Sequence, residues 1–165
     1  MVEFWTPKDK ADRGWRLEKY WKRKDKADLL KARTFTRLCK IALRVIRRMP
    51  KPIGEVCGPI STGGYSDKKK NIRAFKATIK KLIVQGKNIF NQMPFEDSME
   101  RILRTPVFKG GDQLLVEFYF PIFESRLITT FYFMANWKTS VGARWEHRQA
   151  KRLKIPIVYL PEDFS

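Results

Sequence analysis

Ser140, Gly142 and Glu146 form a short polar motif near the end of the chain. A serine at the start of a helix accepts a backbone N–H and leaves the N–H groups of Val141 and Gly142 free, where the helix dipole favours an anion. Ser140 and Gly142 are therefore predicted to bind phosphate. Glu146 follows Gly142 by one helical turn, and helical side chains lean toward the N-terminus. Its carboxylate would meet the sugar of a bound nucleotide; the alternative is a glutamate that only complements the helix dipole.

The elements around this motif place it at the edge of a sheet. Apolar runs over 127–134 and 155–160 predict strands, and the pattern between them predicts a helix over 141–153. A βαβ unit of this kind binds ligands outside the carboxyl ends of its strands. The turn before the helix contains Asn136 and Trp137 and is therefore expected to line the substrate site, where Trp137 either stacks on a base or packs within the protein.

A glycine-rich turn follows another predicted strand at 53–57. Glycines let the backbone approach a ligand closely, and Ser66 or Asp67 is predicted to cap the basic helix that comes next. The turn lacks the Lys and Ser/Thr of a P-loop and the spacing of a dinucleotide fingerprint. The sequence therefore argues against an NTPase and against a dehydrogenase.

Three segments resemble the nucleoside 2-deoxyribosyltransferase superfamily, and most closely its 2'-deoxynucleoside 5'-monophosphate N-glycosidase branch. They are the Cys-Gly-Pro-Ile-Ser turn at 57–61, the Ser140-x-Gly142-x-x-x-Glu146 helix start and the run Ala-Lys-Arg-Leu-Lys-Ile-Pro-Ile at 150–157. The resemblance implies a flavodoxin-like three-layer α/β fold and a homodimer with shared active sites. It also implies a nucleotide or nucleoside substrate whose base–sugar bond is cleaved.

The resemblance assigns roles to individual residues. Glu146 corresponds to the nucleophile that attacks the anomeric carbon, and Ser140 and Gly142 correspond to the residues that bind the 5'-phosphate. The pocket for base and sugar is assigned to the first turn, through Gly58, Ile60, Gly63, Gly64 and Tyr65. A glycosyl intermediate on Glu146 would be resolved by water in a hydrolase or by a second base in a transferase, and the sequence leaves both open.

One position departs from the family pattern. The family usually has an aspartate that helps to handle the leaving base, and the segment 112–126 offers only Asp112, Glu117 and Glu124. Neither Glu117 nor Glu124 lies in a recognisable motif. A second function class therefore stays open, a nucleotide or nucleic-acid binding protein that keeps the fold without catalysis.

The chain is strongly basic, with 35 Lys and Arg against 17 Asp and Glu and a net charge of +18. Residues 1–50 hold 16 of the basic and 6 of the acidic residues. A basic N-terminal region that carries Trp15 and Trp21 is able to hold a nucleic-acid backbone and stack on bases. The alternative is a solvated basic face whose aromatic residues belong to the core or to a dimer contact.

The alternation of elements predicts a mostly parallel sheet flanked by helices, with a basic helical extension over 1–50 and the α/β domain over 51–165. An aromatic segment interrupted by Pro121 is expected to be a helix kinked or broken near that proline. The predicted elements are helix 27–49, strand 53–57, helix 67–85, strand 88–91, helix 96–104, helix 112–126, strand 127–134, helix 141–153 and strand 155–160.

Length and composition indicate whether the chain has a packed core, a metal site or a membrane segment. The chain has 165 residues, of which 43% are apolar, enough for a packed core. Two cysteines and one histidine make neither a disulfide framework nor an ordinary metal site, so we expect reduced thiols and no cofactor. No apolar run approaches the roughly 20 residues of a membrane span, and the N-terminus lacks an apolar signal core, so we expect a cytoplasmic protein.

Overall fold

The computed structural model describes residues 19–164 and divides them into two compact units. The helical unit consists of 19–49 and 92–127, and the sheet unit consists of 50–91 and 128–164. The segment 92–127 thus belongs with the N-terminal helices, because the helix α3 (Phe35–Arg48) packs against the later segments η3 (Leu115–Tyr119) and α6 (Phe120–Glu124). Trp15 and the rest of the basic extension before residue 19 lie outside the described residues.

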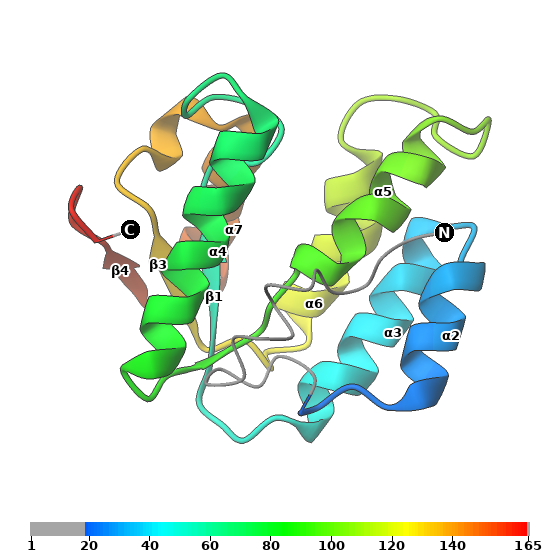
Figure 1. Cartoon of the computed structure of the whole chain (residues 1–165), viewed down its shortest axis with the longest axis horizontal. Coiled ribbons are helices and arrows are strands. Elements are labelled where there is room, and N and C mark those ends of the chain that lie inside the picture. The colour runs from blue at the N-terminus through cyan, green and yellow to red at the C-terminus, as the bar shows by residue number, and fades with distance from the viewer. Residues whose placement is uncertain (1–18, 165) are drawn as a thin grey trace. The chain divides into compact units, whose positions relative to one another are not determined.

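The regular elements in the described part of the helical unit are all helical (Figure 1). Its elements are α2 (Arg23–Lys31), α3 (Phe35–Arg48), the 3-10 turn η2 (Met93–Phe95), α5 (Glu96–Leu103), the π-helical segment η3 (Leu115–Tyr119) and α6 (Phe120–Glu124).

The expected single helix over 27–49 is wrong, because the chain breaks between α2 and α3. Ala32 and Thr34 have extended backbone, and the Thr34 hydroxyl accepts the Arg37 N–H at 3.2 Å to start α3. A threonine cap of this kind satisfies one of the free N–H groups of a new helix. The apolar residues keep helical spacing across the break, which explains why their pattern does not reveal it.

A buried aspartate joins α2 to α3. Asp25 accepts hydrogen bonds from the guanidinium groups of Arg44, at 3.0 Å, and of Arg48. Burial alone would raise the pKa of Asp25, but the hydrogen bonds from Arg48, the Lys22 backbone and Arg44 hold this pKa below its usual value. The stability that this carboxylate supplies is therefore present above its ordinary pKa and is lost as pH falls through the lowered one.

Aromatic side chains fill the core of the helical unit. Trp21 lies 5.3 Å from Phe95, and Phe95 lies 5.2 Å from Phe118, measured between ring centroids. Trp21 is buried, so the structure supports the core interpretation of this residue and not the stacking of its ring on bases. The helix expected over this segment does not break near Pro121, because the π-helical segment up to Tyr119 continues directly as α6, which has Pro121 in its first turn.

A parallel sheet organises the second unit. Its elements are β1 (Ile53–Cys57), α4 (Lys68–Val84), β2 (Asn88–Ile89), β3 (Thr130–Phe133), the 3-10 turn η4 (Trp137–Thr139), α7 (Val141–Leu153) and β4 (Ile157–Tyr159). The four described strands have the order β2-β1-β3-β4 and all pair in parallel, with Glu55 opposite Phe131 and Cys57 opposite Phe133. The predicted α/β class is confirmed, and this order is that of a doubly wound sheet.

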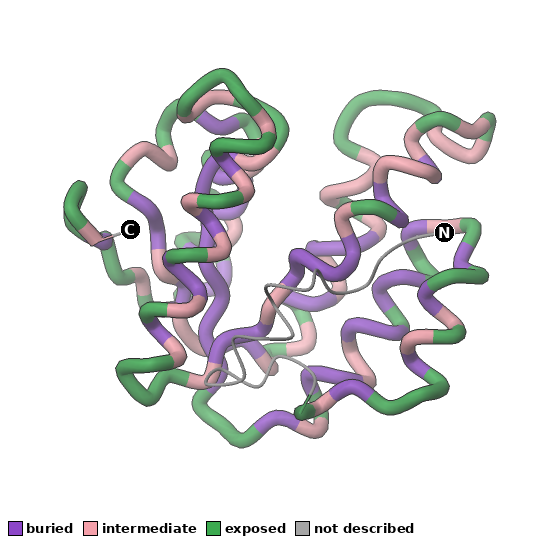
Figure 2. The backbone as a smooth tube through the Cα atoms, in the orientation of Figure 1, coloured by how far each residue is buried: buried purple, intermediate pink, exposed green. Residues whose placement is uncertain are grey.

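Helices cover both faces of this sheet. In Figure 1, α4 lies in front of β1 and α7 lies behind it. All five residues of β1 are buried, as the purple stretch in Figure 2 shows. A strand covered on both faces is expected to be apolar throughout, so a charged residue within it needs a specific explanation.

The helices that the structure describes are all too short or too polar to cross a membrane.

Candidate active site

Glu146 lies in the second turn of α7 with its side chain turned toward the sheet. The helix starts at Ser140, whose hydroxyl accepts the Ala143 N–H at 3.1 Å. Glu146 is only 7% exposed, and its Oε2 accepts a hydrogen bond from the Cys57 thiol at 3.2 Å. Since Cys57 is the last residue of β1, the predicted nucleophile lies at the carboxyl end of that strand and directly before the glycine-rich turn.

A second carboxyl group lies close enough to Glu146 for the two to interact electrostatically. Glu55 precedes Cys57 by two residues, so both side chains point from β1 to the same face. Glu55 is fully buried, and neither of its carboxyl oxygens has a hydrogen-bond partner among the described residues. We refer to Glu55, Cys57 and Glu146 as the acid cluster.

Burial keeps the acid cluster protonated at neutral pH. It raises the pKa of Glu146 to about 8, against the opposing effect of the Cys57 hydrogen bond. Burial also raises the pKa of Glu55 well above its usual value, and the neighbouring Glu146 carboxylate raises it further. The Cys57 pKa is raised by burial and then by the two carboxylates, so its thiol is a hydrogen-bond donor. Two adjacent carboxyl groups with raised pKa values are typical of acid–base and nucleophilic sites.

The two predicted turns lie side by side at this edge of the sheet. The Val141 N–H donates to the Thr62 hydroxyl at 3.0 Å, and the Gly64 N–H donates to the Thr139 hydroxyl at 2.7 Å. Gly63 has a positive φ of 69°, and a Cβ at this position would collide with the Thr139 carbonyl group. Only glycine therefore allows this close approach of the two turns.

These contacts correct one detail of the predicted phosphate site. The Val141 N–H is not free, because Thr62 accepts it. The Ser140 side chain is buried and caps the helix, so it faces the Ala143 N–H. Phosphate binding by Ser140 and Gly142 remains a prediction, and Gly142, which is half-buried, is the more accessible of the two.

Asn71, in the first turn of α4, fixes the shape of the glycine-rich turn. Its amide nitrogen donates to the carbonyl groups of Ile60 and Gly63, both at 3.1 Å, and its amide oxygen accepts the Tyr65 N–H at 3.0 Å. The side chain is 2% exposed. Sequence analysis missed this residue, although a polar residue on the buried face of an amphipathic helix is a recognisable pattern.

Gly58 has a packing function in the structure. A Cβ on this residue would overlap the Met134 side chain at the end of β3. Gly58 therefore lets β1 and β3 pass closely, as expected of a glycine that allows close approach to the backbone. The group that approaches it is a protein side chain, however, and not the ligand that was expected there.

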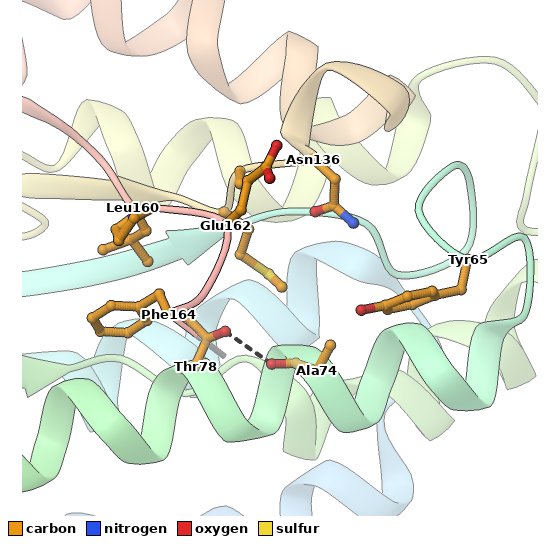
Figure 3. A pocket seen from close by; sticks show the side chains of 10 residues that line it. Tyr65, Ala74, Thr78, Asn136, Leu160, Glu162 and Phe164 are labelled. Carbon is orange, nitrogen blue, oxygen red and sulfur yellow. Dashed lines mark hydrogen bonds between the residues drawn. The ribbon is translucent and has the colours of Figure 1, made fainter.

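A cavity of about 270 Å³ lies beside α4 at the same edge of the sheet. Figure 3 shows Tyr65 and Asn136, both predicted substrate-binding residues, at its wall, together with Thr78 of α4 and Glu162 of the C-terminal segment. The remaining lining residues are Ala74, Met134, Ala135, Leu160, Pro161 and Phe164. Glu146 does not line this cavity, so the cavity and the acid cluster are two separate features of the sheet unit.

Trp137 packs beside His147 and away from Glu146. Its ring stacks on the His147 ring with centroids 4.1 Å apart and planes inclined by 19°. His147 is next to Glu146 in the sequence, and successive helical side chains point about 100° apart. Trp137 therefore belongs to the surface that carries His147 and not to the acid cluster.

The acidic residues considered as substitutes for the family aspartate lie in the helical unit. Asp112 and Glu124 are exposed, and Glu117 accepts a hydrogen bond from Gln113 at 3.1 Å. The carboxyl group that the structure brings close to Glu146 is Glu55, which sequence analysis did not single out. The sequence signal that could have identified Glu55 is its position, since it is an acidic residue inside a strand expected to be buried on both faces.

No family model, no curated protein and no solved structure matches this chain.

Proposed function

We propose that this chain cleaves the base–sugar bond of a nucleotide or nucleoside, with Glu146 as the nucleophile. The observation that carries the proposal is the position of Glu146, whose carboxyl group contacts Cys57 at 3.2 Å where β1 enters the glycine-rich turn. The second turn is tied to the first through Thr62 and Val141. A ligand at the carboxyl edge of the sheet would therefore lie beside the Glu146 carboxyl group, the glycine-rich turn after β1 and the turn before α7.

The proton that the raised pKa keeps on Glu146 has a place in the proposed reaction. Its carboxyl oxygen forms a bond to the anomeric carbon, the carbon–nitrogen bond breaks, and the electron pair leaves with the base. The proton that Glu146 holds in the free protein balances the proton that the departing base takes up. Water then adds to the anomeric carbon and returns a proton to the released carboxylate, as in retaining glycosidases.

The substrate itself favours the reactive form of Glu146. An oxocarbenium-like sugar carries positive charge, and a nearby positive charge lowers the pKa of a carboxyl group. Burial keeps Glu146 neutral in the free protein. When positive charge develops on the sugar, the same burial strengthens the attraction between that charge and the Glu146 carboxylate, because water does not screen the two charges from each other. This is an interaction stronger in the transition state than in the ground state, which is what accelerates a reaction.

The test is base release from a panel of ribonucleoside and deoxyribonucleoside 5'-monophosphates and of free nucleosides, followed by chromatography. We expect release by the wild-type protein and a loss of at least 100-fold, on the order expected for removal of a nucleophile, in Glu146→Gln. Glu124→Gln is the matched control, because it makes the same chemical change at an exposed carboxylate of the helical unit. No release from any substrate, or equal release by Glu146→Gln, would overturn the proposal.

A further inference from the structure

Three aromatic rings are packed on one another where α7 meets the edge of the sheet. His147 stacks on Trp137 at 4.1 Å, and Trp137 and Tyr159 have centroids 6.3 Å apart with planes inclined by 25°. His147 Nε2 and the Tyr159 hydroxyl lie 2.6 Å apart, within hydrogen-bond distance. We refer to Trp137, His147 and Tyr159 as the aromatic shelf.

The shelf is accessible on its outer side. Tyr159 is 57% exposed and belongs to β4, which is the last strand of the described sheet, and the other two rings are half-buried. Burial, followed by the charges of Lys151 and Lys138, lowers the pKa of His147 and keeps its ring uncharged at neutral pH. The exposed part of Tyr159, at the side of this uncharged stack, therefore offers a π surface that is suited to stacking.

Cations surround this surface. Arg144, Arg148 and Lys151 are exposed and lie three, one and four residues from His147, so they share or flank its face of α7. Lys138 Nζ lies 5.8 Å from the centre of the Trp137 ring. None of these four cations forms an ion pair with a carboxylate among the described residues. The one acid of α7, Glu146, is buried in the acid cluster.

We propose that the aromatic shelf and the cations of α7 bind single-stranded nucleic acid, with bases stacked on the shelf and phosphates held by Arg144, Arg148 and Lys151. Stacking on aromatic rings combined with a positive surface is how proteins hold single strands without reading sequence. Duplex bases are already stacked on one another and leave no face for Trp137 or Tyr159, so the aromatic part of the site selects the single strand. The site is independent of the proposed function, because it uses none of the acid cluster.

The test measures the anisotropy of a short dye-labelled oligothymidylate titrated with the full chain at several salt concentrations. We expect Tyr159→Leu to weaken binding by about tenfold, the size of one lost base stack, and Tyr159→Phe to retain binding because the ring remains. The double variant Arg148→Gln/Lys151→Gln should bind with a shallower salt dependence. The slope of the logarithm of the binding constant against the logarithm of the salt concentration should decrease in magnitude by about 0.7 for each lost phosphate contact.

The matched control is the pair Lys69→Gln and Arg73→Gln, two exposed cations of α4 in the same unit and with the same change in charge. Unchanged binding by the control supports the site on α7. Equal losses in both pairs would overturn the proposal in favour of diffuse attraction by the net charge of +18. Equal affinity for a duplex, or equal losses in Tyr159→Phe and Tyr159→Leu, would also overturn it.

Discussion

The Cys57 thiol donates a hydrogen bond to Glu146 Oε2 over 3.2 Å, which joins the last residue of β1 to the second turn of α7. The donor favours the ionised form of the carboxyl group, while burial favours the neutral form, and burial is the larger effect. Glu146 is thus held at a pKa of about 8, where small changes in its surroundings alter its charge.

The stability of the protein should fall as pH rises from about 4.5 to about 8. The unfolded chain loses the Glu146 proton near the usual pKa of 4.5, whereas the folded protein keeps it up to about 8. The stability due to the neutral carboxyl group is therefore fully present below 4.5 and is lost as pH rises through the folded pKa, by about 1.4 kcal/mol for each pH unit. Urea unfolding at pH 5, 6, 7 and 8 measures this slope.

The Glu146→Gln variant supplies the control for that slope. Glutamine does not titrate, so the free energy of unfolding of this variant should change less between pH 5 and pH 8 than that of the wild type. The same slope in both proteins would mean that Glu146 titrates normally.

The pH dependence of kcat/KM should report the same carboxyl group. This parameter reflects the free protein, in which Glu146 must hold the proton that the departing base takes up, so it should fall as pH rises and reach half its plateau near pH 8. Cys57→Ala removes the donor that stabilises the carboxylate and should move the midpoint to higher pH, whereas Cys57→Ser keeps a donor and should move it less. A midpoint that is the same in the alanine variant and the wild type would exclude the hydrogen bond as a cause.

Replacement of Glu55 should stabilise the protein. Its buried carboxyl oxygens have no partner among the described residues, and an unsatisfied buried polar group costs about 1 to 3 kcal/mol. Glu55→Met fills a similar volume with an apolar side chain and should raise the free energy of unfolding by that amount, and by more at alkaline pH. Thermal unfolding at pH 7 and pH 9 measures the effect, and a less stable Glu55→Met would show that the carboxyl group has a stabilising partner.

Asn71→Leu should loosen the glycine-rich turn. The variant removes three hydrogen bonds that join Asn71 to Ile60, Gly63 and Tyr65. Amide hydrogen exchange should accelerate at Gly64 and Tyr65 and stay unchanged in β4. The control is Asn88→Leu, because Asn88 makes a single long contact with the Pro52 carbonyl at 3.4 Å. Equal protection of the turn in both variants would contradict this function of Asn71.

Local chemistry explains which elements could be predicted from the sequence. The strand at 53–57 and the helix at 141–153 have the predicted bounds, because Gly58 ends an apolar run and Ser140 caps the helix. The break at Ala32–Thr34 was not predicted, since the apolar spacing continues across it. The association of 92–127 with the N-terminal helices was not predicted either, because it depends on contacts between segments far apart in the sequence.

The candidate site could be predicted only in part. The helix start at Ser140 and the inward position of Glu146 follow from capping and periodicity. The proximity of Glu55 and Cys57 to Glu146 depends on the order of the strands and on the face of β1 that α7 covers, which are tertiary properties. The stacking of Trp137 on His147 is likewise a contact between a turn and a helix that no local pattern specifies.

The most direct test of the central claim is to look for the sugar on Glu146. Wild-type protein is mixed with each substrate that releases base, quenched in acid within the turnover time and digested, and the peptides are weighed by mass spectrometry. The proposed function predicts a peptide containing Glu146 that is heavier by the glycosyl group, and no such peptide from Glu146→Gln. Base release without this adduct, or an adduct on another residue, would contradict the assignment of Glu146 as the nucleophile.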